Sequence, residues 1–510
     1  MIKTTKILRN VFSNWTGYLI TSLVGFALSP FVVHQLGETG YGVWTLVVSL
    51  TGYFGLLDLG VRSSVGRFVA RNLALGEHES VNRVLSSALA ILAGAGAAAF
   101  TITMALRFGF GSFAIDAEYQ ASAGLALLIA GLNISIALPA GTFGGLLIAM
   151  ERFDVLTGIS VASALIRAAL VVAALKSGRS LVALALIQLL VSLAEYAAML
   201  VCSRALYRHL ALGWKHVNGA ACRELLGFGI YRFIWTIANQ LIFYTDSIVI
   251  ATFLNAGAIT AYAIASNLMN YGRTVVSLAT DTLYPAATQM DSRNDREGLK
   301  DLLTVGTTMA LSVAVPLCLG FVFLGRPFIS LWMGEEYASS AAILLVLTIP
   351  QLTSMSQYTS SLILAGMARH RILAYVVLCE AVANIVLSIM LVRKMGVIGV
   401  AWGTAIPHLV STGIVIPAYM LRTLGWSAGE YFRRAYVKPL LCGIPVAALC
   451  YWLSNRFESP TWVVFALEAA AVALLYLTMS YFICLTPGQR ISVSSRLGIF
   501  LRREPQSSEA

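Results

Sequence analysis

The chain of 510 residues is dominated by apolar runs of membrane-spanning length, separated by short polar segments. A helical run of about 20 residues matches the hydrocarbon thickness of a bilayer. Because lipid offers no water to bond exposed backbone groups, such runs must pair their N–H and C=O groups internally. Charged residues make up 12% of the chain, against about a quarter in soluble domains. The sequence therefore predicts an all-α polytopic membrane protein.

About fourteen transmembrane helices are predicted, in two pseudo-symmetric six-helix lobes followed by a C-terminal helix pair. The predicted lobes cover 1–215 and 216–425, the extra pair covers 426–485, and a tail covers 486–510. The predicted spans are 13–33, 41–61, 84–106, 121–146, 157–175, 181–202, 230–253, 260–283, 302–325, 341–365, 372–392, 398–421, 439–454 and 461–484.

The two lobes share a sparse sequence repeat at an offset of about 217 residues. The matched pairs are Leu36 with Leu254, Trp44 with Tyr262, Leu50 with Leu268, Met150 with Met367 and Arg152 with Arg369. A duplicated six-helix unit is a frequent way to build a transporter with its substrate site between two lobes. The repeat therefore favours a transporter.

Positive charge is distributed unevenly across the predicted spans. With the N-terminus inside, the inner segments hold 25 of the 35 Lys and Arg residues and the outer loops hold 7. Short loops rich in Lys and Arg stay in the cytoplasm, so both termini are expected there. The net charge of +11 then reflects segments beside anionic membrane lipid, and no nucleic-acid partner is expected.

Common catalytic and metal motifs do not occur in the chain. It has no P-loop, no G-x-S-x-G, no H-E-x-x-H and no C-x-x-C, and its seven cysteines fall mostly in apolar runs. We therefore expect neither a disulfide framework nor a metal site. No enzymatic activity is expected, because every external loop is short.

Ionisable residues within the predicted spans are the main functional signal, because each costs about 3 kcal/mol or more at mid-bilayer. Polar side chains gather near some of them in spans 7 and 8. The candidate substrate-cavity residues are Arg167, Arg232, Arg273, Asp246, Asn239, Asn267, Asn270 and Tyr271. Arginine binds phosphate bidentately, so a cationic cavity suits an anionic substrate. The alternative is an interhelical ion pair, with Asp246 or Glu380 as partner, and Glu195 is interpreted as a packing or snorkelling residue.

Four further residues are candidates for gating or ion coupling. Asp58 and Arg62 lie one helical turn apart, so a local ion pair is the simpler interpretation. Glu380 lies in the inner half of the eleventh span. His408 follows Pro407 in the twelfth span and is either a hydrogen-bonded packing residue or a proton-coupling group.

Four segments resemble a known family. They are LGETGYGVWTLVVSL (Leu36–Leu50), LNAGAITAYAIASNL (Leu254–Leu268), LLIAMERFDVL (Leu146–Leu156) and KMGVIGVAWGTAIP (Lys394–Pro407). They are similar to turns of the Wzx-like flippases for lipid-linked oligosaccharides, within the multidrug/oligosaccharidyl-lipid/polysaccharide exporter superfamily. The resemblance covers nearly the whole chain in order and length.

The resemblance implies an activity. Members of the family move undecaprenyl-pyrophosphate-linked repeat units across the bacterial cytoplasmic membrane by alternating access, for O-antigen, capsule or exopolysaccharide synthesis. No cofactor is implied, and coupling to H⁺ or Na⁺ is proposed for some members. A polysaccharide polymerase and a chain-length regulator are the implied protein partners.

Several alternatives stay open at this stage. A multidrug or cation antiporter of the toxin-extrusion type would normally have twelve spans and an acidic residue in the first span. A polysaccharide polymerase or ligase would need a substantial external loop. Within the flippase class, a lipid II flippase and a teichuronic-acid or capsule exporter are also compatible with the sequence.

Overall fold

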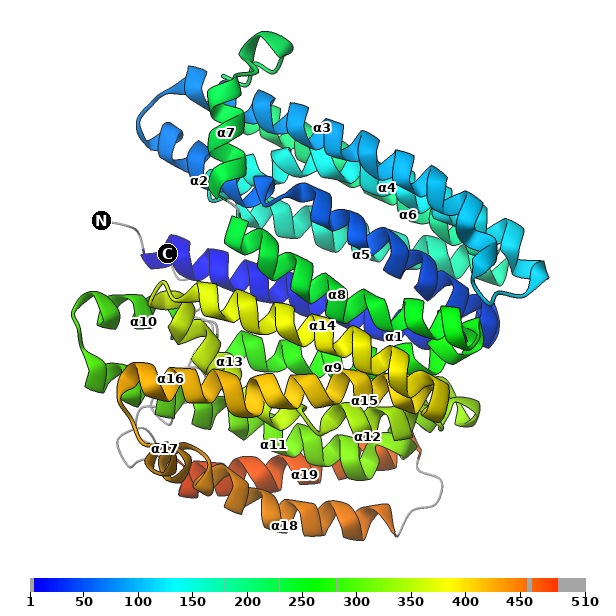
Figure 1. Ribbon diagram of the computed structural model, residues 1–510, viewed down its shortest axis with the longest axis vertical. Coiled ribbons are helices and arrows are strands. Elements are labelled where there is room, and N and C mark those ends of the chain that lie inside the picture. Colours follow the sequence, from blue (N-terminus) through cyan, green and yellow to red (C-terminus); the bar gives the residue numbers. More distant parts are fainter. Residues whose placement is uncertain (1–3, 179, 229, 281–282, 456–460, 485–510) are drawn as a thin grey trace, which may run out of the picture. The chain divides into compact units, whose positions relative to one another are not determined.

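A computed structural model describes residues 4–178, 180–228, 230–280, 283–455 and 461–484. Within these residues the secondary structure is helical and contains no strand (Figure 1). The α-helices are α1 (Thr4–Gly52), α2 (Val61–Ala74), α3 (His78–Gly109), α4 (Ala117–Ala149), α5 (Phe153–Lys176), α6 (Leu181–Leu206), α7 (Gly219–Phe228), α8 (Ile230–Phe253), α9 (Ala256–Thr280), α10 (Leu283–Ser292), α11 (Arg296–Met333), α12 (Ser340–Thr348), α13 (Gln351–Gly366), α14 (His370–Met395), α15 (Val397–Val410), α16 (Ile416–Leu424), α17 (Ala428–Ala435), α18 (Val437–Ser454) and α19 (Trp462–Ile483).

Short 3₁₀ or π segments connect some of these helices. They are η1 (Tyr53–Asp58), η2 (Phe110–Ser112), η3 (Trp214–His216), η4 (Glu335–Tyr337) and η5 (Ser411–Val415), of which η5 is a π-helix. The predicted tail 486–510 lies outside the described residues.

Ten helices within the described residues are long and apolar enough to cross a membrane. The first, Trp15–Asp58, contains the two predicted spans 13–33 and 41–61 almost entirely. Pro350 separates α12 from α13 within another predicted span, 341–365. The predicted all-α polytopic fold class is confirmed, whereas the number of fourteen spans and the limits of the lobes stay predictions.

Two glycines explain the turn between the first two predicted spans. Gly37 has a φ of 71° and breaks the helical path inside α1, a conformation that glycine adopts without a Cβ penalty. At Gly42 an added Cβ would lie 1.8 Å from the carbonyl oxygen of Ala256, at the start of α9. Thr260 also donates a hydrogen bond to the carbonyl oxygen of Glu38 (2.6 Å). The two repeated turns therefore pack closely against each other.

The chain divides into two compact units. Unit 1 comprises residues 1–267 and 370–407, and unit 2 comprises residues 268–369 and 408–510. Within unit 1, α4 packs between α3 and α6, α1 packs on α5 and α8, and α8 packs on α14 (Figure 1). The core around α2, α3 and α4 is apolar and includes Val65, Leu85, Leu92 and Leu146.

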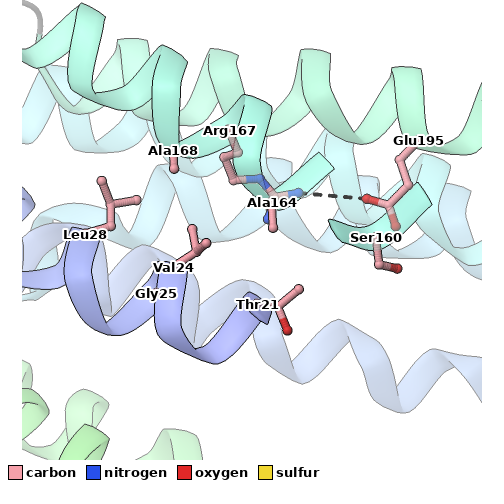
Figure 2. Close-up of a pocket in the computed structure, with 9 residues that line it drawn as sticks. All are labelled: Thr21, Val24, Gly25, Leu28, Ser160, Ala164, Arg167, Ala168 and Glu195. Atoms are coloured by element: carbon pink, nitrogen blue, oxygen red, sulfur yellow. Dashed lines mark ion pairs between the residues drawn. The ribbon is translucent and has the colours of Figure 1, made fainter. Parts of the chain in front are cut away.

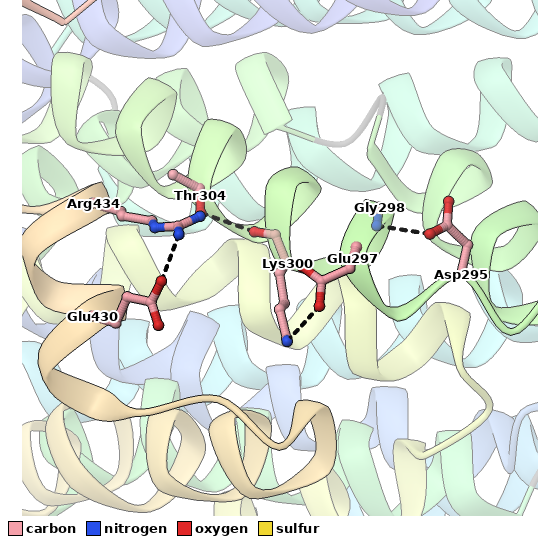
Figure 3. Close-up of polar contacts among 7 residues, drawn as sticks. All are labelled: Asp295, Glu297, Gly298, Lys300, Thr304, Glu430 and Arg434. Atoms are coloured by element: carbon pink, nitrogen blue, oxygen red, sulfur yellow. Dashed lines mark hydrogen bonds and ion pairs between the residues drawn. The ribbon is translucent and has the colours of Figure 1, made fainter.

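Within unit 2, α11 is the central helix and packs against α13, α18 and α19. Asp295 caps its start by accepting a hydrogen bond from the N–H of Gly298 (2.9 Å), and Lys300 bonds to Glu297 in the next turn (2.7 Å) (Figure 3). An ion pair between Glu430 and Arg434 stabilises the short helix α17. Each contact joins residues one turn apart, which stabilises a helix end locally.

Candidate functional site

A pocket of about 320 Å³ lies between α1, α5 and α6 in unit 1 (Figure 2). Helix α1 contributes apolar side chains and Thr21, while α5 contributes Ser160 and Arg167. Glu195 completes the pocket from α6 and points towards Arg167. The pocket therefore combines an apolar wall with one cation, one carboxylate and two hydroxyl groups.

Arg167 forms a long ion pair in this pocket. Its Nη2 lies 3.9 Å from Oε2 of Glu195, and the two side chains are 32% and 18% exposed. The buried Nε of Arg167 has no hydrogen-bond partner. A guanidinium has five donors in a planar fork, so Arg167 keeps donor capacity for an anionic ligand. The sequence predicts a snorkelling or packing role for Glu195, and only the packing of α6 on α5 shows that this residue lines the pocket.

Asp246 on α8 lies at the centre of a second polar cluster in unit 1. It is 3% exposed, and its Oδ2 accepts hydrogen bonds from Tyr262 of α9 and from Oγ1 of Thr404 of α15 (2.8 Å). Asn384 of α14 donates to the same Thr404 hydroxyl (2.8 Å). Four helices thus converge on one carboxylate, and the described residues pair it with hydroxyl groups rather than with a cation.

Two oxygens of this cluster lack partners. Oδ1 of Asp246 and Oδ1 of Asn384 are both buried and make no hydrogen bond. An unpaired polar group of this kind normally costs about 1–3 kcal/mol, so its retention suggests a bound ion, a proton or a water. The carboxylate, amide and hydroxyl oxygens of this cluster are ligand types that a hard cation prefers. Among the described residues, no group of three or more His, Cys, Asp or Glu side chains could hold a metal ion.

Unit 2 contains a third cluster, built around Arg273 of α9. Its Nε donates to Oε1 of Gln351 at the start of α13 (3.2 Å), and its Nη2 lies 3.4 Å from Nε2 of His408 on α15. Because a guanidinium only donates, Nε2 of His408 is the acceptor in this contact. The π-helix η5 begins three residues later, and such bulges are frequent at functional sites. Two separate candidates, Arg273 and His408, are therefore direct neighbours.

Asp58 and Arg62 form the expected local ion pair, with Nε of Arg62 3.4 Å from Oδ1 of Asp58. Nη2 of Arg62 also donates to the carbonyl oxygen of Ala137 on α4 (2.7 Å). The pair joins the end of η1 to the start of α2 and fixes both to α4. A role of this pair in gating stays a prediction.

The remaining candidates are distributed over both units. Asn267 donates to the Tyr41 hydroxyl (3.5 Å), and Glu380 is buried on α14 one turn before Asn384. Asn239 lies on α8 in unit 1, whereas Asn270 and Tyr271 lie on the part of α9 that belongs to unit 2. Arg232 is on α8, but its side chain lies outside the described residues.

Comparison with known proteins identifies the family. Residues 7–291, more than half of the chain, match the model of a family described as "Polysaccharide biosynthesis protein". The chain belongs to this family. The resemblance to Wzx-like polysaccharide flippases, inferred from the four turns, is confirmed.

The chain is also similar to individual relatives and, in its fold, to solved structures. EpsK, described as an uncharacterized membrane protein of Bacillus subtilis, is 22% identical over 503 residues, covering 96% of this chain and 97% of EpsK. A putative O-antigen transporter of Shigella flexneri is 21% identical and covers 78% of this chain and 93% of its own. The fold is similar to that of the lipid II flippase MurJ in an inward closed conformation (TM-score 0.71, 14% identity, 93% and 98% covered). It is also similar to an inward-facing MATE multidrug transporter (TM-score 0.67, 13% identity, 79% and 94% covered).

Proposed function

We propose that this protein is a flippase that moves lipid-linked oligosaccharide repeat units across the bacterial cytoplasmic membrane for surface-polysaccharide synthesis. The family match over residues 7–291 supports the pathway, and the relative named as a putative O-antigen transporter supports the class of cargo. The observation that carries the proposal is the pocket of about 320 Å³ between α1, α5 and α6, which Arg167 lines together with apolar side chains, Glu195 and two hydroxyl groups.

The chemistry of that pocket fits the polar end of such a cargo. Arg167 can bind a phosphate oxygen by charge-assisted hydrogen bonds, and the hydroxyls of Ser160 and Thr21 can bond to a phosphate or a sugar. Glu195 lowers the local net charge, so a phosphate would be bound without being held too tightly for release. The polyprenyl chain needs no site within the protein, because it can stay in the bilayer.

Transport is driven, in this proposal, by H⁺ or Na⁺ bound at the Asp246 cluster. The two unpartnered oxygens of Asp246 and Asn384, together with the hydroxyls of Tyr262 and Thr404, supply only oxygen ligands. A monovalent cation or a proton would neutralise the one carboxylate, which is costly to keep charged in a dry interior. No organic cofactor is needed.

We further propose that the protein performs no covalent chemistry, has both termini in the cytoplasm and works beside a polysaccharide polymerase and a chain-length regulator. The membrane orientation has a direct test with two exposed positions. A membrane-impermeant thiol reagent applied to intact cells should label Glu336→Cys and leave Arg293→Cys unlabelled. Labelling of position 293 alone would reverse the orientation.

The transport activity is tested in proteoliposomes that contain the purified protein and a fluorescent undecaprenyl-pyrophosphate oligosaccharide. Protein-dependent movement of the labelled lipid between leaflets is the expected result. The competing function, a multidrug antiporter, is suggested by the fold similarity to the MATE transporter. Efflux of cationic dyes from the same vesicles, without movement of the lipid-linked glycan, would replace the flippase proposal with that function.

A further inference from the structure

The segment between α6 and α7, residues 207–218, is fixed to the start of α3 by a row of polar side chains. We call this segment the linker. The side chains on α3 are His78, Asn82, Ser86 and Ser87, of which the first three are spaced four residues apart. Residues at this spacing lie on one face of a helix, so α3 presents a polar stripe along which the linker runs.

Side chains of the stripe bind the backbone of the linker at three places. Asn82 donates to the carbonyl oxygen of His209 (2.9 Å) and accepts from the N–H of Ala211 (3.0 Å). Ser86 accepts from the N–H of Gly213 (3.4 Å). These bonds hold the part of the linker before the short 3₁₀ segment η3, and Asn82 is itself buried.

The far end of the linker is held in the same way. Ser87, which is fully buried, accepts from the N–H of Asn218 (3.0 Å) and lies 3.5 Å from its carbonyl oxygen. The side chain of Asn218 in turn accepts from the N–H of Ala220 in the first turn of α7 (2.8 Å). The docked linker therefore sets where the second repeat begins.

Aromatic and titratable side chains join the first residues of the linker to the start of α3. The imidazoles of His78 and His209 are stacked, with centroids 4.1 Å apart and an interplanar angle of 18°. Nδ1 of His78 lies 2.9 Å from the hydroxyl of Tyr207. Burial raises the pKa of Tyr207, so the phenol stays protonated and can donate to His78. His216 adds a third imidazole, whose buried Nε2 has no partner.

We propose that this contact is a pH-sensitive latch: protonation of the stacked His78–His209 pair releases the linker from α3. Histidine is the side chain whose charge changes between pH 5 and 8. One imidazolium stacked on a neutral imidazole is tolerated, whereas two parallel imidazolium rings at this spacing repel each other. Acidification therefore favours the released state, in which the rings can separate.

The surroundings disfavour a second positive charge on this pair. His78 is the first residue of α3, where the helix dipole is positive. Cations outnumber carboxylates on α3 itself and on the segments packed against its first turns. Those groups are Glu77, Glu79 and Arg83 around the start of α3, Asp58 of η1, Arg62, Arg67 and Arg71 of α2, Glu151 and Arg152 after α4, Arg208, Lys215 and His216 of the linker, and Arg223 and Glu224 of α7.

Two of the carboxylates have other partners. Glu79 pairs with Arg83 (2.5 Å), and Asp58 pairs with Arg62 (3.4 Å). The sign of the pH effect follows from linkage: the released state binds more protons than the docked state, so docking weakens as the pH falls. The orientation proposed above puts the latch in the cytoplasm, where it would respond to cytoplasmic acidification.

Hydrogen exchange measured by mass spectrometry tests the latch in lipid nanodiscs. Exchange times are scaled for the pH dependence of intrinsic exchange, and the amides of Ala211, Gly213 and Asn218 are followed at pH 7.5 and 5.5. In the wild type we expect protection of these amides to fall by about tenfold at the lower pH, the effect of one additional proton taken up over one pH unit. Equal protection at both pH values would overturn the proposal.

Two variants distinguish release of the linker by histidine protonation from a simple loss of packing. His209→Phe keeps a ring stacked on His78 but cannot be protonated, so the linker should stay protected at both pH values. Asn82→Ala removes two backbone hydrogen bonds and should lower protection at both values by a similar factor, leaving the pH ratio unchanged. If amide protection in His209→Phe falls between pH 7.5 and 5.5 as much as in the wild type, groups other than the His78–His209 pair cause the pH effect. Peptides from α4 and α6 report whether each variant is folded, and no step depends on transport.

Discussion

Two arginine–glutamate pairs in this protein have similar distances and very different surroundings. Arg326 and Glu335 lie 3.4 Å apart near the end of α11, with both side chains more than 70% exposed. Arg167 and Glu195 lie 3.9 Å apart in the pocket of unit 1, and both are largely shielded by neighbouring helices. The longer contact is thus the one in the less polar environment.

The distance between two charged groups therefore does not by itself rank ion pairs. An exposed pair contributes about 0–1 kcal/mol, because water screens it and both side chains lose freedom. A shielded pair must offset the desolvation of both ions, and a separation of 3.9 Å with an unpartnered Nε is far from the geometry that would do so. The geometry of the Arg167–Glu195 pair is therefore poorly explained by stability, which supports the proposal that Arg167 binds a ligand.

The largest effect is expected from removing the shielded arginine. Arg167→Ala leaves Glu195 without its partner and removes the proposed phosphate contact, so polysaccharide export should fall about 30-fold or more, corresponding to about 2 kcal/mol. Arg167→Lys keeps the charge without the planar fork and should lose less. Export is measured as surface polymer in cells that depend on the introduced gene, normalised to the amount of protein in the membrane.

Arg326→Ala is the matched control for this experiment. It removes the same side chain from the exposed pair and should leave export unchanged. Normal export by Arg167→Ala at a normal protein level would remove Arg167 from the substrate pathway and leave the pair as a structural contact. Equal losses in both variants would instead show that arginine removal disturbs the protein generally.

The contrast between these two pairs was only partly predictable from sequence. Hydropathy predicted the helical class because lipid imposes a minimum length on each span, and Gly37 was recognised within a turn motif. The partner of Arg167 was not predicted, because it depends on how α5 and α6 are rotated against each other. The neighbours Arg273 and His408 are 135 residues apart, and no local periodicity relates them.

A second prediction concerns Asp246, whose carboxylate is bonded to hydroxyl groups, whereas that of Glu195 faces an arginine. If Asp246 binds Na⁺, 100 mM NaCl should raise the melting temperature of the purified protein by several degrees relative to choline chloride. Saturation to about 100 times the Kd stabilises by about 2.7 kcal/mol. Asp246→Asn should lose this response, whereas Asp301→Asn, at an exposed position, should retain it.

The outcome also distinguishes the two ions. Stability that depends on pH at constant Na⁺, and loses that dependence in Asp246→Asn, would identify a proton as the ligand. If neither ion affects the wild type more than the variant, the cluster is a structural hydrogen-bond network and the coupling proposal fails.

A third prediction asks whether close packing, rather than charge, maintains unit 1. Gly42→Ala would place a Cβ against the carbonyl oxygen of Ala256, so α1 and α9 would have to separate. Overpacking of this kind costs about 1–3 kcal/mol and should lower the melting temperature by a few degrees. Gly94→Ala is the control, because an added Cβ there meets nothing within 4 Å. Equal melting temperatures would show that the two repeated turns separate at little cost.

The smallest effect is expected at the exposed pair. Hydrogen bonds from Ser330 and Arg326 hold the pKa of Glu335 below its ordinary value of 4.5. A lowered pKa in the folded state stabilises the protein above that value, and the contribution is lost as the pH falls below it. Because Glu335 is fully exposed to solvent, Arg326→Ala should melt at the wild-type temperature at pH 7 within error. Ser330→Ala removes the larger cause of the lowered pKa, so any loss of stability should be greater there, and it should disappear as the pH falls through the folded-state pKa of Glu335. A marked loss of stability in Arg326→Ala at pH 7 would mean that an exposed ion pair also stabilises this protein. The comparison with Arg326–Glu335 would then no longer support ligand binding at Arg167.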